Sequence, residues 1–171
     1  MYPTIRLSIP VSDEDLERVS EENPGWKIER DSRGGLVMSP TTSSGGAKSS
    51  ALNHQIFVFA ARVGGKSFDS STGFTLPDNS VLSPDAAWIS EGRWSALTPK
   101  ARDSYAPIVP DVWIELLSKT DNRLVLQAKL QRIKAFGARY VLLVDPYERT
   151  LWSEGEPPDG FVLDDEAIFD A

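Results

Sequence analysis

The chain has 171 residues, of which 40% are hydrophobic and 25% are charged, a composition that suits one soluble domain and excludes a wholly disordered chain. It contains no cysteine and a single histidine, which excludes disulfide scaffolds, thiolate zinc sites and multi-histidine metal centres. The net charge of −7 comes from the last residues, 154–171, which hold seven acidic and no basic side chains, so the rest of the chain is neutral and is not a strongly basic nucleic-acid binder.

The N-terminal part predicts a helix followed by a hairpin. Ser12 precedes three acidic residues, as at a capped helix start, and Pro24-Gly25 ends the helix. Trp26–Arg30 and Gly35–Ser39 are predicted to be two short strands joined by a turn.

The middle of the chain predicts one helix and several short strands. Thr41–Ser50 is rich in Ser, Gly and Thr and is expected to be a loop. Ala51–Val63 has the apolar spacing of a helix, which Gly64-Gly65 ends. Ser90–Arg102 is expected to be a surface excursion with a short helix. Short strands are expected near Ser67–Asp69, Gly73–Leu76 and Ala86–Ser90.

The last third predicts a β-α-β unit. Val112–Leu117 is expected to be a strand, Leu124–Phe136 a helix and Arg139–Asp145 a strand buried on both faces. A right-handed parallel crossover should connect the two strands, and Glu148–Trp152 should add an edge strand. We therefore expect one α/β domain over residues 1–153, with a mixed, partly parallel sheet flanked by helices, and an acidic, solvated C-terminal tail over residues 154–171.

The expected location is the cytoplasm. The N-terminus lacks a basic start followed by a long apolar run, so no signal peptide is expected. No apolar stretch approaches the roughly 18–20 residues that a membrane span needs. A membrane partner is therefore not expected.

Glu115 is a carboxylate within an otherwise apolar strand. Trp113, Glu115 and Leu117 share one face of that strand. A buried carboxylate without a partner costs several kcal/mol, so it must be paired, protonated or bound to a metal. The alternative to a metal site is an ion pair with a basic residue of the adjacent helix.

Asp85 and Lys129 are candidate partners of Glu115. Asp85 follows Pro84 at the start of a predicted strand, where the alternative is a turn acid that makes local hydrogen bonds. Lys129 lies at the flank of the apolar helix face and can lean towards Glu115; alternatively its ammonium extends into water.

Together these three side chains provide the groups for metal-dependent phosphodiester hydrolysis. Two carboxylates can hold Mg²⁺ (or Mn²⁺) by hard oxygen ligation. The metal polarises the phosphate and activates a water, and Lys129 steadies that water or the developing negative charge. Residues 119–139 carry six basic side chains against one acid, so a phosphate backbone could lie there, although a solvated helix face is the alternative reading.

Six motifs then follow one another in a characteristic order. They are MSPT (Met38–Thr41), FDSSTGFTLPD (Phe68–Asp78), SPDAAWIS (Ser83–Ser90), RWSALTP (Arg93–Pro99), YAPIVPDVWIELLS (Tyr105–Ser118) and LQAKLQRIKAFGARYVLLVDP (Leu126–Pro146). In this order the chain resembles the Uma-two family of restriction endonucleases, which share the PD-(D/E)xK nuclease fold. The resemblance covers roughly residues 25–153.

The resemblance implies a restriction-endonuclease-like core and a site. Pro84-Asp85 is the implied "PD", Glu115 the second acid and Glu29 a candidate third carboxylate and metal ligand. Leu117 stands where the nuclease pattern has a lysine, so Lys129 is the implied substitute.

The implied function is a Mg²⁺-dependent endonuclease that cuts DNA, acting as a homodimer by analogy with this fold class. A catalytically inactive nuclease fold that serves as a binding module is the alternative, and an RNA nuclease is a further one.

Overall fold

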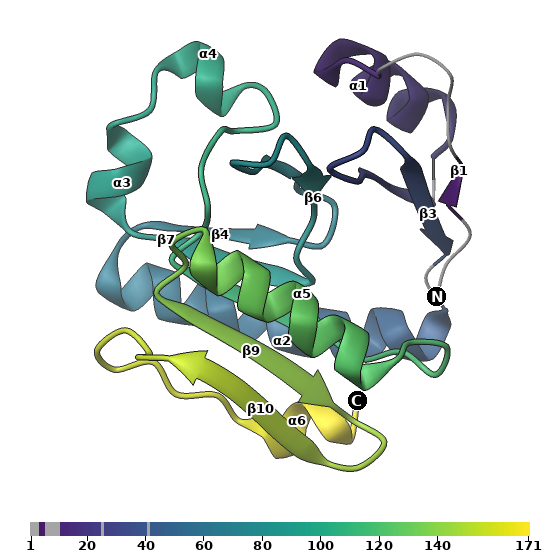
Figure 1. Ribbon diagram of the computed structural model, residues 1–171. Helices are drawn as coiled ribbons and strands as arrows, with labels where there is room; N and C mark the ends of the chain where they lie inside the picture. The colour runs from purple at the N-terminus through teal and green to yellow at the C-terminus, as the bar shows by residue number, and fades with distance from the viewer. Residues whose placement is uncertain (1–3, 6–10, 25, 41) are drawn as a thin grey trace.

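The computed structural model describes residues 4–5, 11–24, 26–40 and 42–171 and has two five-stranded sheets with helices packed against them (Figure 1). The larger sheet has the strand order β10-β9-β8-β7-β4, and the smaller one has the order β1-β3-β2-β6-β5. The α/β class and the mixed sheet agree with the expectation from the sequence. The division into two sheets is a feature that the sequence pattern did not reveal.

The larger sheet is built around the predicted β-α-β unit. Strand β8 (Val112–Leu116) leads through helix α5 (Arg123–Ala135) to β9 (Tyr140–Asp145), and the two strands pair in parallel. The other pairs are antiparallel, made by β4 (Lys66–Asp69), β7 (Ala86–Ile89) and the edge strand β10 (Thr150–Gly155).

Helices cover the two faces of this sheet. Val141 and Leu143 of β9 pack with Leu130 and Ile133 of α5 on one face. Leu142 and Val144 pack on the other face against helix α2 (Ser43–Val63). Figure 1 shows α5 in front of the strands and α2 behind them. The continuous apolar run of β9 is therefore explained by burial on both faces.

The smaller sheet extends from the predicted hairpin. Strand β2 (Trp26–Arg30) pairs antiparallel with β3 (Leu36–Pro40), and β1 (Thr4–Ile5) lies beside β3. On the other side β2 contacts β6 (Val81–Leu82), which pairs with β5 (Phe74–Thr75). Helix α1 (Asp13–Glu22) packs Leu16 against this sheet, and its N-cap residue, Ser12, forms a capping box with Asp15. Gly25, part of the predicted helix stop, lies outside the described residues.

Helix α2 corrects one expectation. The predicted loop over Thr41–Ser50 is wrong from Ser43 onward, because α2 (Ser43–Val63) begins there, and Thr41 lies outside the described residues. Thr42 caps it by accepting a hydrogen bond from the amide of Gly45. Lys48 donates hydrogen bonds to the backbone carbonyls of Phe169 and Ala171. These tertiary contacts compensate for the weak helix propensity of this Ser/Gly-rich turn.

The C-terminal tail corrects a second expectation. Its end forms helix α6 (Asp165–Phe169), in which Ile168 and Phe169 are buried against α2 rather than solvated. Arg149 pairs with Glu166 and Asp170, so a basic side chain outside the tail neutralises part of the tail's negative charge. The excursion after β7 contains two short helices, α3 (Glu91–Ser95) and α4 (Pro99–Arg102), where one was expected.

Candidate active site

Asp85 and Glu115 lie side by side at the β7–β8 ladder. Ala86 is paired with Ile114, so the antiparallel register places Asp85 opposite Glu115 one step further on. The amide of Asp85 donates to the carbonyl of Ile114 (2.9 Å), and the Asp85 carboxylate accepts from the amide of Leu116 (2.7 Å). Strand alternation directs both carboxylates to the face covered by α5.

Glu115 is held by two donors. Its Oε1 accepts from the indole Nε1 of Trp113 (2.7 Å), which lies two residues earlier on the same strand face. Trp113 is fully buried, and a buried indole N–H requires an acceptor. The ammonium of Lys129 lies 2.8 Å from the same oxygen. Glu115 itself is only 4% exposed, so its charge is compensated by these partners rather than by water.

Lys129 extends from α5 to the carboxylate of Glu115, as its place on the flank of the apolar helix face predicted. Its Nζ is also 3.8 Å from Oε1 of Glu29, whose carboxylate accepts a hydrogen bond from the amide of Ser83 (2.7 Å). No ion pair joins Lys129 to Asp85 among the described residues. Lys129 therefore lies between two carboxylates from different sheets.

Leu117 is a core residue, and the amine nearest to Glu115 comes from helix α5. Its side chain follows Trp113 and Glu115 on the same strand face and packs in the core with Leu130 and Ile133 of α5. A lysine at position 117 would bury its stem and its ammonium among these apolar side chains. The amine at this site instead enters from α5 through Lys129.

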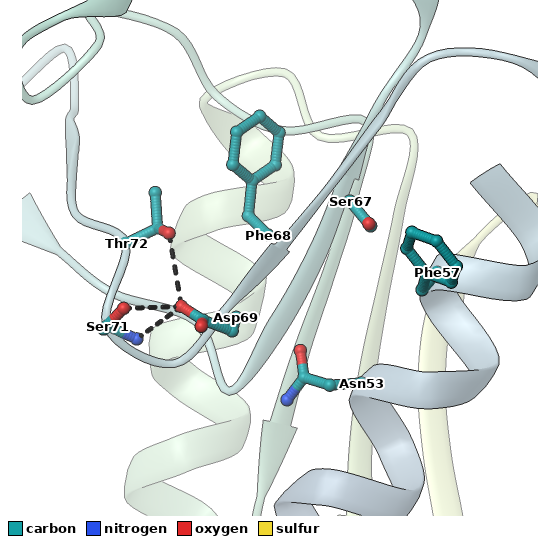
Figure 2. A pocket seen from close by; sticks show the side chains of 7 residues that line it. All are labelled: Asn53, Phe57, Ser67, Phe68, Asp69, Ser71 and Thr72. Carbon is teal, nitrogen blue, oxygen red and sulfur yellow. Dashed lines mark hydrogen bonds between the residues drawn. The ribbon is translucent and has the colours of Figure 1, made fainter. Parts of the chain in front are cut away.

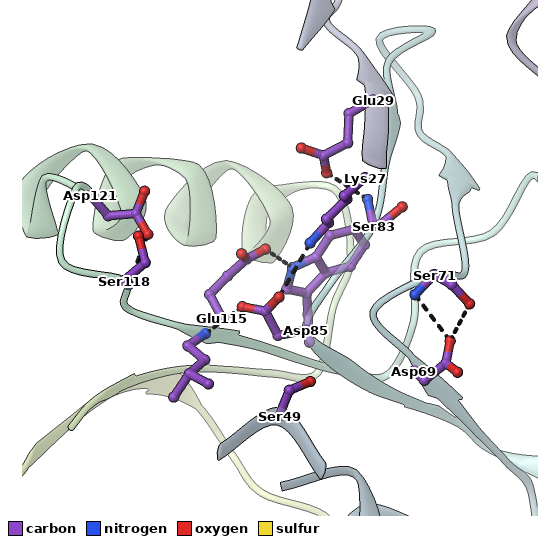
Figure 3. A network of polar contacts seen from close by, with 12 residues as sticks. Lys27, Glu29, Ser49, Asp69, Ser71, Ser83, Asp85, Glu115, Ser118 and Asp121 are labelled. Atoms are coloured by element: carbon purple, nitrogen blue, oxygen red, sulfur yellow. Dashed lines mark hydrogen bonds and ion pairs between the residues drawn. The ribbon is translucent and has the colours of Figure 1, made fainter. Parts of the chain in front are cut away.

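A second lysine, Lys27, was not predicted from the sequence. Its Nζ lies 3.3 Å from Oδ1 of Asp85 (Figure 3). On β2, Lys27 and Glu29 share the face that is opposite to the buried Ile28 and Arg30. Lys27 could therefore have been predicted from the sequence, because a strand that presents Glu29 to the site also presents the residue two positions earlier.

The buried lysines and carboxylates of the site shift one another's pKa values. Burial by itself lowers the pKa of Lys129, but the carboxylates of Glu115 and Glu29 outweigh it and the pKa is raised. Lys27 behaves in the same way: burial lowers its pKa, and Asp85 and Glu29 raise it further than burial lowers it. Burial raises the pKa of Glu115, Lys129 opposes this rise, and Asp85 adds to it. Both ammonium groups are therefore charged at neutral pH.

The donor set fits a magnesium-type ion held by two carboxylates. In the described part of the chain, no three His, Cys, Asp or Glu side chains are grouped so that they could hold a metal ion together. Mg²⁺ does not need such a group, because it keeps several waters and is commonly bound by one or two carboxylates together with substrate phosphate. Asp85 and Glu115 offer hard oxygen atoms from adjacent strands. Glu29, the candidate third ligand, instead contacts Ser83 and faces Lys129.

The basic stretch around α5 is largely paired within the protein. Arg123 pairs with Asp145, Arg132 with Asp78 and Arg139 with Asp159, in addition to Lys129 with Glu115. This stretch therefore presents less free positive charge than its sequence indicates. The neutral balance of the body and these pairs together argue against tight nonspecific attraction of a phosphate backbone.

A shallow pocket of ≈ 410 Å³ lies beside the site, between α2 and the loop that follows β4 (Figure 2). Its acid, Asp69, accepts hydrogen bonds from Ser71 and Thr72 and so stabilises its own loop. Asn53 links the pocket to the site by donating to the backbone carbonyl of Asp85 (3.0 Å). The convergence of acids and amines is found at Asp85 and Glu115, and not in this pocket.

Comparison with known proteins identifies a shared fold and a family. No curated protein matches the chain. A crystal structure at 1.96 Å resolution of a protein from Anabaena variabilis ATCC 29413, described as a "putative nuclease belonging to DUF820", matches with a TM-score of 0.66 and 17% identity. The match covers 91% of this chain and 97% of that chain, and at this identity it shows a shared fold.

No helix in the described ranges is both long enough and apolar enough to cross a membrane.

The family is shown by a second comparison. The model of the Uma2 family, described as "Putative restriction endonuclease", matches residues 13–165. This range contains all five charged side chains of the site, on β2, before β7, on β8 and on α5. Because the match extends over most of the chain, this protein belongs to the Uma2 family.

Proposed function

We propose that this protein is a metal-dependent endonuclease that hydrolyses DNA phosphodiester bonds at the site formed by Asp85, Glu115 and Lys129. The observation that carries the proposal is the convergence of two carboxylates from adjacent strands with a lysine from α5, whose amine lies 2.8 Å from Glu115. The family described as restriction endonuclease supplies the reaction class. Plasmid cleavage in the presence of different ions tests whether DNA is the substrate and which ion is needed.

Each residue has a distinct role in this proposal. Asp85 and Glu115 would hold Mg²⁺ or Mn²⁺, which when bound supplies Lewis-acid activation of the scissile phosphate and of a water. Trp113 and the amide of Leu116 keep the two carboxylates in place through hydrogen bonds of 2.7 Å. Lys129 presents a fixed positive charge towards the phosphate oxygens as negative charge develops on them. Glu29 orients Lys129 from the opposite side.

The direct test is cleavage of supercoiled plasmid DNA by the wild-type protein with Mg²⁺, Mn²⁺ or EDTA. We expect cleavage with either ion and none with EDTA. Asp85→Asn should slow cleavage by more than about 100-fold because it removes a ligand charge, and Asp159→Asn, at a fully exposed acid, should cleave like the wild type. A homodimer that cuts both strands would yield linear DNA, whereas separate single cuts would yield nicked circles.

The catalytically inactive binding module remains the second candidate, because both site carboxylates already have an ammonium partner within the protein. No cleavage of DNA or RNA in either ion would favour this candidate and contradict the nuclease proposal. Cleavage of RNA with no cleavage of plasmid would replace DNA with RNA as the substrate.

A further inference from the structure

Lys27 brings a positive charge from the smaller sheet into a site that is otherwise built on the larger one. Its Nζ lies 3.3 Å from Oδ1 of Asp85, and the two side chains are 18% and 21% exposed. Figure 3 shows Lys27 and Asp85 pointing towards each other, with Glu29 and Glu115 on either side. The pair is therefore a partly buried contact between two sheets rather than an incidental surface ion pair.

Lys27 contacts the carboxylate oxygen of Asp85 that a divalent cation would coordinate. Oδ2 of Asp85 is occupied by the amide of Leu116, so Oδ1 is the oxygen that faces the site, and Lys27 contacts it. Oε1 of Glu115 accepts from Trp113 and Lys129, while Oε2 has no partner among the described residues. An ion held between Asp85 and Glu115 would therefore approach the ammonium of Lys27 closely and be repelled by it.

The charges of the whole cluster lead to the same conclusion. Three carboxylates, Asp85, Glu115 and Glu29, surround the ammonium groups of Lys27 and Lys129, which leaves one net negative charge. Removal of the positive charge of Lys27 would leave two net negative charges. The side chains of this cluster are little exposed, so these charges are screened weakly. Such a change should strengthen the binding of a divalent cation.

We propose that Lys27 is a resident counterion that a divalent cation must displace from Asp85, so that this lysine sets the metal affinity of the site. The inference rests on the proposed function for the role of Asp85 as a ligand. In this proposal Lys27 is a positioning residue. Without the ion it neutralises Asp85 and connects the two sheets, and with the ion it gives up that contact.

Calorimetric titration with Mn²⁺ at fixed pH and ionic strength tests the proposal. Lys27→Met should bind Mn²⁺ at least about tenfold more tightly than the wild type, because the competing charge is gone. Lys27→Gln, which keeps a hydrogen-bond donor for Asp85, should show the same direction of change and serves if the Met variant does not fold. Lys66→Met, at an exposed lysine on β4, should bind like the wild type. Lys27→Met combined with Asp85→Asn should lose the gain.

The outcomes separate this inference from the proposed function. Equal or weaker binding by both Lys27 variants would overturn the inference, and a wild type that still cleaves DNA would leave the proposed function intact. Binding by the Lys27 variants but not by the wild type would support the inference and, together with an inactive wild type, overturn the proposed function. Absence of binding in every variant would overturn the inference, because no ion would compete with Lys27.

Discussion

Glu115→Gln is expected to abolish the stabilisation of this protein by divalent ions. At an ion concentration ten times the dissociation constant, mass action adds about 1.4 kcal/mol to the stability of the wild type. This raises the Tm of a domain of this size by about 3–5 °C. The Gln side chain has nearly the same shape and can still accept from Trp113, but it lacks the charge that an ion requires. Thermal unfolding with and without 10 mM MnCl₂ measures the effect.

The matched control is Glu154→Gln, which changes the same chemical group at an exposed position of β10. It should keep the whole Mn²⁺-dependent shift. A Glu115→Gln protein that gains as much from Mn²⁺ as the wild type would mean that ions bind elsewhere on the molecule. In that case the two-carboxylate site loses its support.

Lys129→Met is expected to reduce both stability and cleavage, for separate reasons. It leaves Glu115, whose side chain is 6% exposed, without its ammonium partner. Breaking a buried pair in this way costs about 3 kcal/mol, the lower end of the usual range, because the Lys129 side chain retains 19% exposure. Cleavage should fall by about 100-fold to 1000-fold, the usual effect of removing one charge-stabilising donor. Urea unfolding and plasmid cleavage measure the two effects.

Combining Lys129→Met with Glu115→Gln separates the two roles. The double variant removes both charges, so it should recover most of the lost unfolding free energy while cleavage stays at background. Lys134→Met, at a half-buried lysine on the same helix outside the site, is the control for the loss of a lysine charge from α5. A Lys129→Met protein with normal stability and normal cleavage would show that the contact of 2.8 Å has neither role.

The fold could be predicted from the sequence wherever the pattern was local. The β8-α5-β9 unit has long apolar runs and clear helical spacing, and its strands and helix were found within one or two residues of their ends. Strands β1, β5 and β6 have only two residues each, so no periodicity could reveal the smaller sheet as a separate layer.

Tertiary contacts explain the two elements that were wrongly assigned. The first turns of α2 and the whole of α6 have weak or strongly polar sequences, and each is stabilised by packing against the other. Contact between residues 48 and 169 is a property of the folded chain that neither local sequence contains. Sequence patterns alone therefore misassigned both segments as loop or tail.

The candidate site followed a similar rule. Glu115 could be predicted as a site residue because an acid in an apolar strand conflicts with its surroundings. Lys129 could be predicted because it flanks the buried face of its helix. Lys27 shows no such conflict on its half-exposed strand. Its partner, Asp85, is 58 positions away, so only the packing of the two sheets brings them together. The resemblance pointed to Glu29, and strand alternation would have added Lys27.

We expect Asp85 and Glu115 to hold one divalent cation between them. A crystal structure of the wild-type protein with Mn²⁺, recorded with anomalous diffraction data, tests it most directly. We expect one anomalous peak within coordination distance of both carboxylates, with the ammonium of Lys27 moved away from Oδ1 of Asp85. A structure at saturating Mn²⁺ that shows no peak there, with the pairs Lys27–Asp85 and Lys129–Glu115 intact, would show that the two carboxylates hold no ion.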